Sequence, residues 1–170
     1  MTHRPDRTEA AEYYFKYIDQ VPDGDLVEIL KEQQRETLSL LRGISEDRSL
    51  HRYEPGKWTL REVLGHLNDT ERLFVFRALW FARGFESPLP SFDQDVAVAA
   101  SAANDRSWGS HVDEFEALRT ATLALFRHLP PDAWLRRGIA SDNPFSVRAL
   151  AYATAGHVAH HAAIIRAKYL

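Results

Sequence analysis

Thr59-Leu60-Arg61-Glu62 opens the most clearly helical segment of the chain, which continues through Val63-Leu64-Gly65-His66-Leu67 to about Arg83. The threonine hydroxyl and the glutamate carboxylate stand three residues apart, as in a capping box that satisfies backbone N–H groups of the first turn. Gly84 follows as a stop signal. This segment therefore predicts a helix over about residues 59–83.

Three further long helices are predicted by apolar residues that recur at three- and four-residue steps. The first spans about residues 25–42 and is followed by Gly43. Another spans about residues 110–128 and stops at Pro130-Pro131. The last spans about residues 146–168, with Ser146 as its N-cap. Nearer the N-terminus, an aromatic stretch predicts a short helix packed across the others, Tyr13-Tyr14-Phe15-Lys16-Tyr17-Ile18.

The predicted fold is all-α, a four-helix bundle with a short N-terminal helix. No segment alternates apolar and polar residues between turn signals, so we expect no sheet. The connection over residues 84–109 is far longer than the usual connection of about 4 to 6 residues, which predicts a crossover between the second and third long helices from one end of the bundle to the other. A chain of 170 residues is expected to form a single domain, residues 1–170.

Histidines are the most informative chemical groups. In Gly156-His157-Val158-Ala159-His160-His161, His157 and His161 are four residues apart, so they project from one helix face about 6 Å apart and can close on one ion. A third ligand must come from another helix, and His66 is the best candidate because it lies mid-helix among leucines. His160 is offset from His161 by about 100° and cannot share that face.

Composition narrows the possible functions. The chain has no cysteine, which excludes disulfides, iron–sulfur clusters, thiolate zinc sites and cysteine nucleophiles. A net charge of -3 with scattered arginines makes nucleic acid an unexpected partner. The N-terminal Met1 to Arg7 lacks the apolar run of a signal peptide, and Pro144 to Ile165 is interrupted by Arg148 and histidines. We therefore expect a cytoplasmic protein that does not span a membrane.

Several stretches resemble the DinB-like superfamily. The segment Tyr53 to Arg72 is similar to the second-helix signature of that family, and Gly156 to His161 is similar to its last-helix motif. Weaker similarities occur at three other places, Tyr17 to Pro22, Pro88 to Asp93 and Ser146 to Ala151. Together these stretches span nearly the whole chain, and their order and spacing are similar to those of the family.

The resemblance implies a four-helix bundle with a long crossover, usually dimeric, that holds one divalent metal on three histidines. Carried over by position, the ligands are His66, His157 and His161. Related proteins include bacillithiol- and mycothiol-dependent S-transferases and isomerases, and proteins described as metal-dependent hydrolases. The family therefore implies a site more clearly than a reaction.

Three functions stay open from the sequence. The first is a metal-dependent transferase in which a low-molecular-weight thiol attacks a small electrophilic substrate. The second is a hydrolase that uses metal-bound hydroxide. The third is a non-catalytic module in which the metal stabilises a dimer or serves a stress response. Zinc and nickel are the expected metals because both suit imidazole ligands.

Neighbouring residues have expected roles. Asp69 is expected to orient a metal ligand or a bound water, and His160 to support the site from beside it or to lie at a helix interface. Asp69 and Asp93 are the candidates for a fourth ligand. Glu71 is expected on the surface or in a dimer contact. Arg77 shares the His66 stripe about 16 Å further along, which favours a salt bridge at the end of the bundle over contact with an anion.

Overall fold

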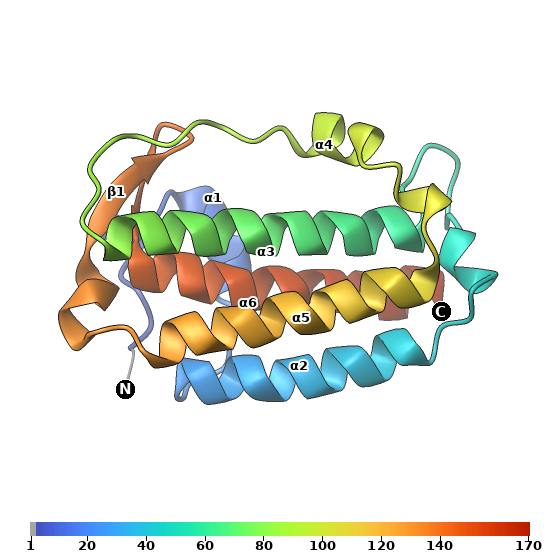
Figure 1. The fold of residues 1–170 in the computed structure, drawn as a ribbon, viewed down its shortest axis with the longest axis horizontal. Helices are drawn as coiled ribbons and strands as arrows, with labels where there is room; N and C mark the ends of the chain where they lie inside the picture. The colour runs from blue at the N-terminus through green and yellow to red at the C-terminus, as the bar shows by residue number, and fades with distance from the viewer. Residues whose placement is uncertain (1–2) are drawn as a thin grey trace.

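The computed structural model describes residues 3–170. Four long helices run along the longest axis of the molecule (Figure 1), and they confirm the predicted bundle. Their observed bounds lie close to the predicted ones: α2 (Leu26–Arg42), α3 (Leu60–Ala82), α5 (Trp108–Arg127) and α6 (Val147–Ile164). The last helix is extended by one π-helical turn, Ile165–Tyr169.

Helix starts follow the local capping chemistry. The Thr59 hydroxyl accepts the Glu62 N–H at 3.1 Å, and the Glu62 carboxylate accepts the Thr59 N–H at 2.7 Å, so the predicted capping box is present. Ser146 caps α6 as expected, accepting the Ala149 N–H at 3.0 Å. The helix α5 begins two residues before the predicted Ser110, because the Ser107 hydroxyl provides the cap.

The long connection between α3 and α5 is a crossover. It leaves the end of α3, passes back along that helix, and reaches the opposite end of the bundle, where α5 begins (Figure 1). As a result α3 and α5 run in the same direction. The crossover contains a short helix that the sequence analysis did not predict, α4 (Gln94–Ala100), whose N-terminal amides are capped by the Asp93 carboxylate.

A β-hairpin corrects the expectation that the chain has no sheet. The strands β1 (Arg137–Ala140) and β2 (Asn143–Ser146) pair antiparallel just before α6. Each strand has four residues, too few to show an alternating pattern. Their turn uses Ser141 and Asp142, both with positive φ, instead of the glycine that usually signals such a turn.

The short N-terminal helix is present as α1 (Glu12–Ile18) and packs against α6. It is held by a buried anchor beside it: the Glu9 carboxylate accepts hydrogen bonds from Ser146 at 2.6 Å and from Arg148 at 2.7 Å. This anchor ties the N-terminal segment to the first turn of α6. Among the helices that residues 3–170 form, none has both the length and the apolar character needed to cross a membrane.

Glu71 lies in the core, and its predicted surface position is wrong. Its carboxylate pairs with Arg119 on α5 at 2.8 and 2.9 Å and accepts the Thr122 hydroxyl at 2.8 Å. The physical reason is that α3 is covered on more than one side: α6 packs on its His66 face and α5 on another. A buried glutamate is tolerated there because its charge is fully paired.

Candidate metal centre

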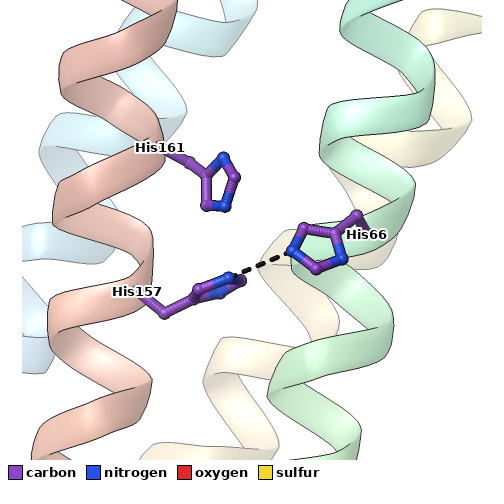
Figure 2. Close-up of side chains that lie close together, drawn as sticks. All are labelled: His66, His157 and His161. Atoms are coloured by element: carbon purple, nitrogen blue, oxygen red, sulfur yellow. Dashed lines mark hydrogen bonds between the residues drawn. The ribbon is translucent and has the colours of Figure 1, made fainter. Parts of the chain in front are cut away.

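The structure brings the three predicted ligands together. His157 and His161 project from one face of α6 toward His66, which faces them from α3 (Figure 2). His66 and His157 are buried, and His161 is partly exposed. One ring nitrogen from each histidine lies within 4.8 Å of the other two.

These distances fit a small cation. The Nε2 atoms of His66 and His157 are 3.1 Å apart. Two nitrogen lone pairs cannot face each other this closely, so the space between them suits either a proton or a metal ion. Imidazole nitrogens about 2.0–2.1 Å from a tetrahedral metal are about 3.4 Å from one another. Small side-chain adjustments would therefore bring all three nitrogens to ligand distance.

Burial keeps the three rings in the form that binds metals. It lowers the pKa of His66 to about 4. Burial, together with the charge of neighbouring His66, lowers the pKa of His161 to about 3, and burial with the neighbouring histidines holds the pKa of His157 well below its ordinary value. All three imidazoles are therefore neutral at pH 7, each with a lone pair available.

Aromatic and hydroxyl groups fix the orientation of the rings. The Trp58 ring packs against His66 with 5.0 Å between ring centroids, and the Thr70 hydroxyl lies 3.5 Å from His66 Nδ1. On the other side, Tyr17 of α1 packs edge-on against His157 at 5.2 Å. The contact of Tyr17 with the histidines was not predicted from the sequence. The residue in the sequence that indicates this contact is Gly156, because a Cβ atom there would collide with the Tyr17 carbonyl group.

A cavity of about 320 Å³ opens beside the histidines. His66 and His157 form part of its wall, and the remainder is largely aromatic: Tyr13, Tyr14, Tyr17, Phe74 and Phe92. Asp93, one of the two candidates for a fourth ligand, also lines this cavity, but its Oδ1 accepts N–H groups of α4 at 2.9 and 3.1 Å. Within residues 3–170, the cluster with ligand spacing consists of the three histidines without a carboxylate.

Asp69 lies in different surroundings. Its carboxylate is 3.5 Å from Arg72 and lines a separate cavity of about 230 Å³ together with His111 and Glu114. A three-residue step turns the helix back by about 60°, which directs Asp69 toward α4 and α5, whereas Thr70 stays on the side of His66. The structure therefore gives the predicted role of Asp69 no support, and Thr70 is the neighbour that lies against His66.

His160 lies at the interface between α6 and α1. Its Nδ1 is 3.4 Å from the Gln20 amide nitrogen, and its ring packs against Tyr17 with 5.3 Å between centroids. The same Tyr17 ring contacts His157. His160 therefore reaches the histidine cluster through Tyr17, and it is separated from the shared ligand face as its helical offset predicts.

The chain is similar to a known protein family and to solved structures. A model of the DinB superfamily matches residues 29–165. Among solved structures, YfiT from Bacillus subtilis, described as a probable metal-dependent hydrolase with an unusual four-helix bundle topology, is similar with a TM-score of 0.66 and 18% identity, over 96% of this chain and 92% of that one.

A second similar structure is a mycothiol-dependent maleylpyruvate isomerase. It has a TM-score of 0.71 and 13% identity, and the match covers 86% of this chain but 61% of the isomerase. Similarity at these identities shows the fold alone. A comparison with curated proteins found no match. The family model spans most of the described bundle, including all three histidines, and the chain belongs to the DinB superfamily.

Proposed function

We propose that this protein is a metal-dependent enzyme that transfers a low-molecular-weight thiol to a small electrophilic substrate. The observation that carries the proposal is the convergence of His66, His157 and His161, without a carboxylate, beside a cavity whose wall includes His66 and His157. A divalent ion, zinc or nickel, held by three neutral imidazoles would keep its full charge and an open position, and would lower the pKa of a thiol or water bound there.

The residues of the chain support this chemistry in three ways. Burial keeps the histidines neutral, so protons compete weakly for the ring nitrogens near pH 7. Tyr17 and Trp58 pack against the rings and keep them turned toward one another. Five aromatic side chains contribute to the cavity wall, and its volume of about 320 Å³ suits a small substrate.

Thiol transfer fits a histidine cluster that contains no carboxylate better than hydrolysis does. A thiol has an ordinary pKa of about 8.5 and ionises readily beside a cation, so its attack needs no separate base. Zinc peptidases with a His-Glu-x-x-His motif use the glutamate as a base. The described part of the chain has no carboxylate within the histidine cluster.

Hydrolysis is the second candidate, and one residue favours it. Asp93 lines the same cavity as His66 and His157. From that position its carboxylate could accept a proton from a water molecule in the cavity. The similarity to a structure described as a probable metal-dependent hydrolase also supports this candidate. Asp93→Asn separates the two reactions, because it should abolish ester hydrolysis and leave thiol transfer unchanged.

The metal site is tested by elemental analysis. His66→Ala and His161→Ala should lose stoichiometric zinc or nickel, because two remaining imidazoles hold a divalent ion far more weakly than three. His160→Ala is the matched control from the same helix and should retain one ion per chain. Full metal content in both ligand variants would disprove the site.

The reaction is tested with the metal-loaded and metal-stripped protein. The loaded form should conjugate small thiols to a model aryl halide faster than the stripped form, and His161→Ala should behave like the stripped form. Faster ester hydrolysis without thiol conjugation would favour the hydrolase. Equal rates in both assays would indicate that the metal stabilises the bundle without catalysis.

We also propose that the protein is a homodimer, as the family resemblance implies. Exposed aromatic side chains near the end of α3 support this proposal, since Phe76 and Phe85 are about half exposed and Phe85 stacks on Trp80. Large exposed apolar groups often mark contacts between proteins. Sedimentation equilibrium should give twice the 19.4 kDa chain mass, and a monomer would contradict the proposal.

A further inference from the structure

Arg77 shares the cavity with the histidines. It follows His66 by eleven residues on α3, a step that returns to within about 20° of the same helix face and advances about 16 Å along the axis. Both side chains line the cavity of about 320 Å³. The cavity therefore has two of the three histidines, His66 and His157, along one part of its wall and the positive charge of Arg77 along another.

The surroundings of Arg77 are unusual for a buried cation. Its side chain is 2% exposed, and its Nη2 donates to the Pro90 carbonyl oxygen and the Ser141 hydroxyl, each at 2.8 Å. Both acceptors are neutral. Across residues 3–170 no carboxylate lies within ion-pair distance of Arg77, so the expected salt bridge at the end of the bundle is wrong.

One hydrogen-bond donor of Arg77 is unused. Its Nε is buried and has no hydrogen-bond partner among the described residues. A buried donor without a partner is costly, and a buried cation without a counter-charge more so. Two other buried arginines show the usual solution, because Arg119 pairs with Glu71 and Arg61 with Glu46. Among the described residues, Arg77 thus has neither a negatively charged partner nor an acceptor for its Nε–H, and a bound anion would supply both.

The fold holds Arg77 in place from two separate segments. Pro90 belongs to the crossover, and Ser141 belongs to the turn of the β-hairpin, where its φ of 51° is rare for a residue other than glycine. Backbone in such conformations is often retained at functional sites. The two acceptors fix the guanidinium without neutralising it.

We propose that Arg77 binds a carboxylate of the substrate or of the thiol, whose reacting group then lies at the histidines. This inference rests on the proposed function for the reaction, but the binding of the carboxylate rests on Arg77 alone. The substrate class is a small organic acid.

A carboxylate fits this position better than a phosphate. Arg77 supplies one cationic group with one free buried N–H, which suits a singly charged oxyanion. Tyr14 lines the same cavity beside Arg77, and burial raises the pKa of Tyr14, so its hydroxyl stays neutral and does not supply the missing counter-charge. The Asp93 carboxylate also lines the cavity, and it disfavours a group that concentrates two negative charges on one centre, as a phosphate does, more than a single carboxylate group.

The test measures binding of glutarate, its neutral diamide and inorganic phosphate to the full chain, by calorimetry. It is run on zinc-loaded protein and again after metal removal, so that binding to the metal is distinguished from binding to Arg77. Glutarate should bind both forms, and the diamide should not. Arg77→Gln should weaken glutarate binding roughly tenfold or more, as expected for a charge-assisted hydrogen bond, while retaining its zinc.

Arg72→Gln is the matched control, since Arg72 is a partly exposed arginine on the same helix that pairs with Glu114. Its glutarate affinity should equal that of the wild type. If Arg77→Gln does not fold, the wild-type protein still gives an answer by NMR, because glutarate should shift one arginine Nε–Hε signal in a saturable way.

The outcomes separate this inference from the proposed function. Glutarate binding that is equal in wild type and Arg77→Gln, tighter phosphate binding, or no shift of an Nε–Hε signal would each overturn the carboxylate site. If glutarate binding depends on Arg77 but the metal-loaded wild-type protein does not transfer thiols, the proposed reaction would be wrong and the carboxylate site would stand. Retained zinc in Arg77→Gln shows that the histidine site does not depend on Arg77.

Discussion

Two neighbouring side chains hold the imidazole ring of His66 in position. Trp58 packs over the imidazole, and Thr70 lies beside Nδ1. The Trp58 backbone is held in turn by the last turn of the chain, because the Tyr169 hydroxyl donates to the Trp58 carbonyl oxygen at 2.7 Å. Contacts of this kind orient a ligand before a metal arrives, which reduces the entropy lost on binding. The ligand geometry therefore depends on residues about one hundred positions apart in the chain.

The pKa of His66 predicts how the metal-free protein responds to acid. The folded chain keeps His66 neutral down to about pH 4, whereas an unfolded histidine takes up a proton near pH 6.5. Between these values the unfolded state binds more protons than the folded state. The contribution of His66 to the free energy of unfolding is therefore greatest above about pH 6.5 and falls as the pH drops toward 4. The loss attributable to His66 is on the order of 3 kcal/mol.

Urea unfolding of the metal-free protein at several pH values between 7.5 and 4.5 measures this loss. His66→Gln, which cannot take up the proton, should show a shallower decline over the same window. Glu9 does not interfere above pH 5: burial alone would raise its pKa, but hydrogen bonds from Arg148 and Ser146 lower it to about 2. An identical decline in both proteins would contradict the prediction.

The helix α6 owes its central place to small side chains. Nearly every residue from Val147 to Val158 is buried, and alanine or glycine recurs through this span. A helix that is apolar on all sides is expected in the centre of a fold. Small residues let α1, α2 and α3 pack against it closely, which brings His157 and His161 within reach of both α1 and α3.

Gly156 is the position where this close approach is most demanding. A Cβ there would collide with the backbone of Tyr17, so Gly156→Ala should displace α1 and destabilise the protein by about 1–3 kcal/mol, the usual cost of overpacking. Because Tyr17 packs on His157, zinc affinity should fall as well.

The control is Gly109→Ala in α5, where a Cβ meets no atom within 4 Å. Removing an exposed helical glycine should raise stability by up to about 1 kcal/mol. Chemical denaturation and zinc titration of the two variants provide the comparison. Equal stability of Gly156→Ala and Gly109→Ala would show that the α1–α6 contact is more adaptable than its geometry indicates.

A hydrogen-bond network that contains Arg119 connects all four long helices. Its guanidinium pairs with Glu71 of α3 and donates to the Leu30 carbonyl oxygen and the Gln33 side chain of α2. Gln33 continues the network by donating to the carbonyl oxygen of Ala155 in α6, the residue directly before the Gly156–His161 motif. The exposed fractions of the Arg119 and Glu71 side chains are 0% and 2%. This network fixes how the helices sit relative to one another.

Breaking the network on one side should be costly. Arg119→Met leaves the Glu71 carboxylate buried and unpaired, so the free energy of unfolding should fall by about 3–5 kcal/mol. The double variant Glu71→Leu/Arg119→Met removes both charges and should be more stable than Arg119→Met. Urea denaturation of the three proteins checks this order, and a double variant less stable than the single one would contradict it.

Predictions from the sequence held where the cause is local. The capping box at Thr59, the cap at Ser146 and the four-residue spacing of His157 and His161 each involve one or two helical turns, and the structure has all three. The long connection also predicted its crossover, since length alone requires the chain to span the bundle.

Predictions failed where the answer depended on what packs against a helix. Glu71 was expected on the surface or in a dimer contact, and Arg77 in a salt bridge at the end of the bundle. Instead α5 covers Glu71, and the crossover with the hairpin encloses Arg77. Asp69 faces α4 and α5 for the same reason. Capping, periodicity and histidine spacing are properties of a single segment, so they can be read along the chain. The charge that Arg77 presents to the cavity arises only when three distant segments come together, because its burial and its neutral partners do not exist before the chain folds.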